Sequence, residues 1–196
     1  MRLLISPTSP YVRKVRLVAM ELKLNLATTA VNPWAEDSDV SAYNPLGKIP
    51  VLVLADGQSL YDSGVIVDYL LSQVPNQTLL PSESMARIGM QTQVALADGL
   101  LDAAVAVVVE QRRPVALQST AYIERQYHTL ARGLDYMAAH LPTLDPVQLD
   151  AIAYGVVAGY VAFRLKDAQL IAQRPALARW WETLKARPSF QATQPE

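Results

Sequence analysis

Polar residues that could bind a ligand occur at three places in the first third of the chain. They are the pair Ser9-Pro10, the loop NPLGKIP at residues 44–50, and the pair Asp62-Ser63. A hydroxyl can donate a hydrogen bond, and a carboxylate or a lysine supplies a charge, so these groups suit a polar ligand. Each place also has an ordinary structural explanation, because Ser and Asp are favoured helix N-caps and an Ile-Pro pair is commonly just extended. The three places follow one another along a single pattern of alternating strands and helices. Together they indicate a ligand-binding site more strongly than any one of them does alone.

Other familiar kinds of site are excluded by composition and spacing. The chain has no cysteine, which removes disulfides, thiol nucleophiles and iron-sulfur clusters. It contains neither GxGxxG nor GxSxG, and Gly47-Lys48 is followed by Ile49 rather than by the Ser or Thr of a Walker loop. The two histidines, His128 and His140, are twelve residues apart. We therefore expect surface or helix-edge histidines and no metal site.

Composition and charge narrow the class of protein. Hydrophobic residues make up 51% of the 196 residues and charged residues 18%, which is enough apolar surface for a globular core. The net charge of -1 comes from interspersed charges, so we expect no nucleic-acid partner. No secretory signal is visible, and the apolar run at residues 151–163 is shorter than the roughly 20 residues of a membrane span. The sequence predicts a cytoplasmic protein with a buried helix in that run.

The first 75 residues show an alternating strand and helix pattern. Residues 2–5 and 26–31 read as strands, and a helix is expected between them from the Ser9 N-cap. Residues 51–54 and 59–61 flank Asp56-Gly57, a pair suited to a tight turn, so they are expected to form an antiparallel hairpin. A further helix is expected from Ser63. The pattern predicts a small α/β domain.

The remainder of the chain reads as helices only. A long helix is expected over 83–113, and the next has apolar residues at alternating steps of four and three from Ile123 to Leu141. Asp145 is expected to cap a third helix, with Pro146 at its first position and Gln148 reaching back, and a fourth is expected from Pro175. The predicted organisation is an α/β domain at 1–75, a linker at 76–84 and an all-helical domain at 85–196.

Four segments together resemble the glutathione S-transferase superfamily, specifically its stand-alone bacterial members. The matching segments are SPTSPYVRKVRLVAMEL at 6–22, YNPLGKIPVLVL at 43–54, LYDSGVIVDYL at 60–70 and WWETLKARPSFQAT at 180–193. The second and fourth are the most specific. The resemblance implies a thioredoxin-like amino-terminal domain that binds glutathione as a co-substrate, an all-α carboxy-terminal domain that helps to bind an electrophile, and a homodimer.

The resemblance also implies roles for particular residues. Ser9 matches the position that contacts the glutathione sulfur, where its hydroxyl would donate a hydrogen bond to the thiolate. Lys48 would neutralise a ligand carboxylate, and Ile49, before a cis-Pro50, would pair through its backbone with the cysteinyl part of the ligand. Asp62 and Ser63 match the residues that hold the γ-glutamyl end.

Some alternatives for these residues stay open. Ser6 and Thr8 lie in the same loop as Ser9 and compete for the sulfur contact. Lys48 can also be read as a solvated loop lysine. Many family members have Glu or Gln at the position of Asp62. The aspartate side chain is one methylene shorter, so its contact with the γ-glutamyl end could be bridged by water or lost.

The expected activity is conjugation of glutathione to a small hydrophobic electrophile. The alternatives are a glutathione-dependent peroxidase or disulfide-bond reductase, and a binding or regulatory protein that keeps the fold without turnover. In the helical domain, core packing is the first expectation for at least one of Trp180 and Trp181. Surface salt bridges are the first expectation for the remaining polar candidates, which are Asp98, Asp102, Arg112 and Arg113.

Overall fold

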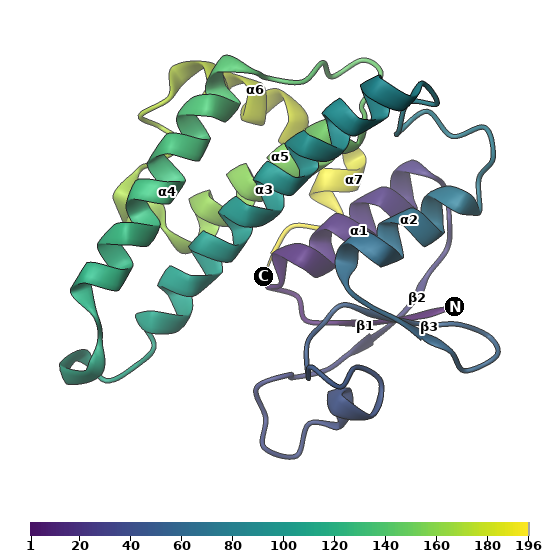
Figure 1. Ribbon diagram of the computed structural model, residues 1–196, viewed down its shortest axis with the longest axis horizontal. Coiled ribbons are helices and arrows are strands. Elements are labelled where there is room, and N and C mark those ends of the chain that lie inside the picture. Colours follow the sequence, from purple (N-terminus) through teal and green to yellow (C-terminus); the bar gives the residue numbers. More distant parts are fainter. Residues whose placement is uncertain (196) are drawn as a thin grey trace. The chain divides into compact units, whose positions relative to one another are not determined.

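The computed structural model describes residues 1–195, which form two compact units (Figure 1). The first unit comprises Met1–Leu79 together with the segment that begins at Pro188, and the second comprises Leu80–Arg187. The predicted combination of a thioredoxin-like α/β part and a helical part is confirmed. The break between the units falls inside the predicted linker at 76–84.

A four-stranded sheet forms the centre of the first unit. Its strands are β1 (Arg2–Ile5), β2 (Ala27–Ala30), β3 (Val51–Val53) and β4 (Ser59–Leu60), in the order β2-β1-β3-β4. β1 is parallel to β2 and antiparallel to β3, and β3 is antiparallel to β4 across the turn at Asp56-Gly57. Gly57 has a positive φ of 89°, a conformation that glycine adopts without steric cost. The predicted strands and hairpin are therefore confirmed.

Two helices, α1 (Pro10–Glu21) and α2 (Ser63–Ser72), lie on one side of this sheet, and the connection from β2 to β3 lies on the other (Figure 1). Side chains alternate along a strand, so Leu3 and Leu4 point to opposite faces. Leu4 packs with Val51 and with Val40 of the 3-10 helix η1 (Asp39–Ala42). The other face has a core of residues with no exposed surface, namely Leu3, Leu17, Val18, Leu52, Ile66 and Leu70.

The second unit is built from helices. They are α3 (Ser84–Glu110), α4 (Thr120–Ala139), α5 (Leu149–Arg164) and α6 (Pro175–Lys185), with short 3-10 helices η2 (Val115–Leu117) and η3 (Lys166–Ala168). α3 packs against both α4 and α5. By length and apolar composition alone α3 could also cross a membrane, but core helices of proteins that enter no membrane share these properties. The predicted apolar helix at 151–163 is confirmed, because α5 is buried from Leu149 to Val161 apart from Asp150.

The predicted seam is confirmed in the second half of α4, whereas Ile123 and Tyr127 are only half-buried and Leu141 lies beyond the end of the helix. Leu130, Leu134 and Met137 have no exposed surface and follow one another at steps of four and three. Between Leu130 and Leu134, a Cβ added to Gly133 would lie 2.3 Å from Cδ2 of Leu100 on α3. The glycine therefore allows an approach of α4 to the Leu100 side chain that a larger residue would permit only if Leu100 shifted.

The predicted start of the third helix is wrong. Asp145 does not cap a helix; the Asp145–Pro146 peptide is cis, and Leu144 pairs with Val147 in an isolated antiparallel bridge. This bridge closes a turn over the two residues that were expected to begin the helix. α5 begins three residues after Pro146, at Leu149, and its N-cap Gln148 makes no capping hydrogen bond through its side chain.

The chain after Arg187 packs with the first unit, whereas the predicted helical domain extended to residue 196. A short helix, α7 (Pro188–Gln191), contacts α1. Phe190 has no exposed surface and Ser189 is nearly buried, so this segment belongs to the core of the α/β unit. The first unit is therefore assembled from two parts of the chain that are distant in sequence.

Candidate functional site

The strand register brings the three predicted segments to one end of the sheet. β1 and β3 are antiparallel with Leu4 opposite Val51, so the end of β1 lies beside the start of β3. β3 and β4 are antiparallel with Leu52 opposite Leu60, so the end of β4 lies at the same place. The loop that leads to Ser9 follows β1, Ile49-Pro50 precedes β3, and Asp62-Ser63 follows β4. Polar groups distant in sequence thus share one edge, where α1 and α2 also begin.

Ser9 is the N-cap of α1, as the sequence predicted. Its backbone is extended, with φ -76° and ψ 123°, and its Oγ accepts a hydrogen bond from the Val12 amide at 3.3 Å. Its own amide donates to the Ser6 carbonyl at 3.1 Å. The side chain is partly buried, as are those of Ser6 and Thr8. Because Oγ accepts from the backbone, the hydroxyl hydrogen of Ser9 can still be donated to another group.

A buried asparagine organises the loop before β3. Asn44 is 3% exposed; its Nδ2 donates to the Lys48 carbonyl at 2.8 Å, and its Oδ1 accepts from the Leu46 amide at 3.0 Å. The Gly47 amide donates to the Asn44 carbonyl at 2.8 Å, and Gly47 has φ of 62°. This role of Asn44 was not predicted, although Asn-Pro followed by Gly is a turn signal.

This loop presents Lys48 and Ile49 in different ways. Lys48 is exposed, whereas Ile49 is partly buried and packs against the cluster of Leu4, Val40 and Val51. The Ile49–Pro50 peptide is cis, and Pro50 is buried. The cis isomer at this position was expected from the resemblance to the family.

Asp62 and Ser63 begin α2. Asp62 is the exposed N-cap, and its Oδ1 accepts from the Gly64 amide at 2.9 Å. Ser63 is the first helical residue and is 4% exposed. A carboxylate has two oxygens, so a cap through Oδ1 is compatible with a further contact through Oδ2. The Tyr61–Asp62 peptide is also cis, a feature that no signal in the sequence pointed to.

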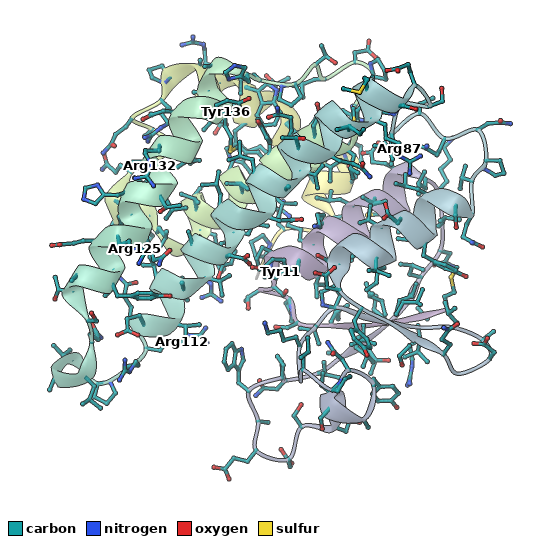
Figure 2. The ribbon with its side chains drawn as sticks, viewed as in Figure 1. Tyr11, Arg87, Arg112, Arg125, Arg132 and Tyr136 are labelled. Carbon is teal, nitrogen blue, oxygen red and sulfur yellow. The ribbon has the colours of Figure 1, made fainter. Side chains whose placement is uncertain are left out.

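Three of the polar and aromatic candidates of the helical unit have structural roles. Trp180 and Trp181 are each 8% exposed, and Trp180 Nε1 donates to the Pro142 carbonyl at 2.9 Å, so core packing is confirmed. Arg113 pairs with Glu110 at 3.0 Å, which confirms a surface salt bridge there. For Asp98, Asp102 and Arg112 the salt-bridge explanation stays a prediction; Figure 2 shows Arg112 just beyond the end of α3.

Both histidines are exposed on α4 or at its end, as predicted. His140 stacks on the Tyr136 ring, with centroids 4.0 Å apart, and its Nδ1 lies 2.9 Å from the Tyr136 carbonyl oxygen. Within residues 1–195 no group of three His, Asp or Glu side chains is placed to hold a metal ion. Two open hollows of about 610 Å³ and 400 Å³ lie along α4 and between α3 and α4. Arg132, labelled on α4 in Figure 2, borders both. None of the predicted site residues lines them.

Altered pKa values occur inside the helical unit. Burial, with smaller contributions from Tyr136 and Asp150, raises the pKa of Tyr154 to about 12. The Tyr154 hydroxyl donates to Oε1 of Gln93 on α3 at 2.5 Å. Burial also raises the pKa of Asp150, although the Ala151 amide opposes that shift. Desolvation within a packed core is the largest cause of both changes, so they indicate no separate reactive centre.

Known proteins resemble the chain over its whole length. Residues 8–73 match the family model described as glutathione S-transferase, N-terminal domain. The uncharacterized GST-like protein YibF of Escherichia coli is 36% identical, and the alignment covers 100% of this chain and 98% of that protein. Glutathione S-transferase 3 of Zea mays is 29% identical over 95% of this chain and 90% of its own length.

Solved structures agree with these relatives. A glutathione S-transferase of Methylobacillus flagellatus with glutathione bound is 42% identical, covers 100% of this chain and 99% of its own, and superposes with a TM-score of 0.94. A second glutathione S-transferase structure, from Methylobacterium radiotolerans in complex with glutathione sulfonate, is 35% identical. It covers 99% of this chain and 94% of its own, with a TM-score of 0.92. With such identity and coverage along its full length, the chain belongs to the glutathione S-transferase superfamily.

Proposed function

We propose that the protein is a glutathione transferase that binds glutathione at the shared edge of the sheet in the first unit. Two relatives hold glutathione or its sulfonate in their structures, which supports glutathione as the ligand here. Glutathione carries a carboxylate at each end, a free amine and a thiol. A site for it needs a cation, hydrogen-bond donors and a carboxylate at separated points, and the edge offers these groups.

We assign one part of the ligand to each of these groups, as the resemblance to the family implies. Lys48 is exposed and can neutralise the glycyl carboxylate. The backbone of Ile49, which precedes cis-Pro50, would pair with the cysteinyl part as an added strand edge. Ser63, in the first turn of α2, would offer its hydroxyl and amide to the γ-glutamyl carboxylate. Asp62 would bind the ammonium group.

The cap of α1 is the observation that carries the proposed mechanism. Ser9 Oγ accepts from the Val12 amide, so its hydrogen is available to the glutathione sulfur. A serine hydroxyl is a far weaker acid than a thiol and cannot act as the base, so its role is to stabilise the thiolate. Lowering a thiol pKa by two units needs about 2.7 kcal/mol. A charge-assisted hydrogen bond of about 1.5–3 kcal/mol, with about 0.3–1 kcal/mol from the helix N-terminus, suffices.

The transfer step then needs no metal and no protein base. The thiol proton passes to solvent, and the thiolate sulfur attacks an electrophilic carbon. A carbon–sulfur bond forms while the bond to the leaving group breaks, and the leaving group departs with the electron pair. Positioning of the two reactants supplies much of the acceleration. We expect a small hydrophobic electrophile, a homodimer and a cytoplasmic location, as is typical of the family.

Replacing Ser9 tests this function. Ser9→Ala should lower turnover with an aryl halide by about 10- to 100-fold, the value of one charge-assisted hydrogen bond, while glutathione affinity changes little. The ultraviolet absorbance of bound thiolate against pH should show a raised thiol pKa in the variant. Ser6→Ala and Thr8→Val are matched controls from the same loop. A loss of turnover in either control, with Ser9→Ala unaffected, would move the sulfur contact to that residue.

Wild-type assays separate the alternative functions. Turnover of an organic hydroperoxide or a mixed glutathione disulfide, without conjugation, would indicate a peroxidase or a reductase. Glutathione binding without any rise in the thiolate fraction would indicate a binding or regulatory protein.

A further inference from the structure

The segment after Arg187 is attached to α1 by a buried arginine. Arg13 is 6% exposed, and its Nη2 donates to the Phe190 carbonyl at 3.2 Å. Its Nε donates to Thr193 Oγ1 at 3.5 Å, and its guanidinium lies 5.6 Å from the centre of the Phe190 ring. Thr193 is 1% exposed and donates in turn to the Ser189 carbonyl at 2.9 Å. Arg13 thus joins the first part of α1 to a folded, buried segment.

Further contacts follow the same helix toward its end. Arg16 Nη2 donates to the Ala192 carbonyl at 3.2 Å, and the Ser189 hydroxyl donates to Glu21 Oε1 at 2.5 Å. The segment is therefore fixed along α1 at more than one point. Arg16 differs from Arg13 in being more exposed and one turn farther from the helix start.

Arg13 carries a buried positive charge in the first part of α1. Removing a guanidinium from water is costly, and a positive charge near a helix N-terminus opposes the helix dipole. Burial, with a smaller contribution from Arg16, lowers the pKa of Arg13 to about 10, so the group is still charged at neutral pH. The contacts with Phe190 and Thr193 hold this charge beside the first part of α1.

The position of Arg13 relative to Ser9 suggests a second role for this side chain. The Arg13 amide donates to the Ser9 carbonyl at 3.1 Å, which closes the first turn of α1. Helical side chains lean toward the N-terminus, so the Arg13 side chain leans over the turn capped by Ser9. Contacts that fix the Arg13 side chain therefore stabilise this turn, and the positive charge of Arg13 adds positive potential near the cap.

We propose that Arg13, anchored by Phe190 and Thr193, is a positioning residue of the glutathione site that favours the thiolate through the Ser9-capped turn. This inference rests on the proposed function. It makes the segment after Arg187 part of the apparatus that sets the reactivity of the bound thiol.

The test measures the pKa of the thiol of bound glutathione from thiolate absorbance against pH. Arg13→Gln should lower the thiolate fraction at neutral pH by about three- to tenfold, the value of one such interaction, and lower kcat with little change in KM for glutathione. Arg13→Lys, which keeps the charge, should restore most of the thiolate. Arg16→Gln is the matched control, because it also loses a charge and a contact to the segment, and it should leave the thiol pKa unchanged.

Several results would overturn the inference. One is an unchanged thiol pKa in Arg13→Gln, and another is an equal shift in Arg16→Gln. Should Arg13→Gln fail to fold, Thr193→Val removes one acceptor of Arg13 and should shift the thiol pKa in the same direction by a smaller amount; no shift in it overturns the inference. A wild type whose bound thiol stays protonated contradicts the proposed function as well. If the wild type lowers the pKa of the bound thiol and the Arg13 and Thr193 variants lower it equally, only this inference is contradicted.

Discussion

The helical unit buries α5 almost completely, whereas the α/β unit leaves Lys48 and Asp62 exposed at one end of its sheet. In the helical unit, apolar side chains and a close approach at Gly133 hold the helices together. At the sheet edge, hydrogen bonds that Ser9 and Asp62 accept from backbone amides, and one that Asn44 donates to a backbone carbonyl, shape the backbone. Substitutions in the two units should therefore have different effects. Loss of a buried side chain in the helical core should lower the stability of the protein, and loss of a polar group at the sheet edge should lower glutathione binding or reactivity.

The largest effect is expected from Leu101→Ala in the helical core. Leu101 on α3 has no exposed surface, so the change should lower the free energy of unfolding by about 2–5 kcal/mol through lost burial and a cavity. Urea unfolding measures this, and glutathione titration of the native protein should give the wild-type affinity. Leu117→Ala is the control, because Leu117 is 58% exposed in the same unit and should change stability by less than about 0.5 kcal/mol. A large loss of glutathione affinity in Leu101→Ala would contradict the separation.

Asn44→Ala should affect both properties. It removes the hydrogen bonds to Lys48 and Leu46, which should cost about 1–3 kcal/mol of stability because polar backbone groups lose their partners. The loop would no longer hold Ile49 in place, so glutathione affinity should fall by about five- to tenfold, as calorimetric titration would show. Asn32→Ala loses a similar bond, from the Trp34 amide to Asn32 Oδ1 at 3.0 Å, in an exposed turn of the same unit. Equal losses of affinity in both variants would refute the role of Asn44.

Asp62→Asn should affect binding without affecting stability. Asparagine is as good an N-cap as aspartate, so the bond from the Gly64 amide can be kept. The ligand ammonium loses its opposite charge, and an exposed pair of this kind contributes about 0.2–1 kcal/mol, which is at most about fivefold in glutathione Kd. Asp56→Asn makes the matching change in the β3–β4 turn, where Asp56 Oδ1 accepts from the Gln58 amide at 3.0 Å. It should leave the Kd unchanged.

The smallest effect concerns the acid dependence of stability. Burial raises the pKa of Asp150 above its ordinary value of 3.8, so the folded protein binds this proton more tightly than the unfolded chain does. The contribution of Asp150 is therefore present below that ordinary value and is lost as pH rises through the raised value. Asp150→Asn should flatten the dependence of Tm on pH in this range. An unchanged profile would show that the carboxyl titrates as it does in the unfolded chain.

Local signals in the sequence predicted much of the fold. Ser9 and Asp62 are N-caps, and Asp56-Gly57 forms the hairpin turn, because these features depend on neighbours within a few residues. The start of α5 was missed because a capping box and a turn use the same residue types at Asp145-Pro146.

Features that depend on distant contacts could not be predicted from local patterns. The packing of α7 on α1 joins residues far apart in sequence, and nothing in the WWETLKARPSF segment shows which unit it will contact. The predicted site residues share one edge only because of the strand register. Their individual contacts with glutathione stay predictions that the substitutions above can test.

The division of the α/β unit into two stretches of chain affects how it is made. A ribosome releases the amino-terminal part first, and the piece that seats Phe190 against α1 emerges only after the entire helical unit. Until that piece has emerged, the hydrogen bond from Arg13 on α1 to the Phe190 carbonyl cannot form.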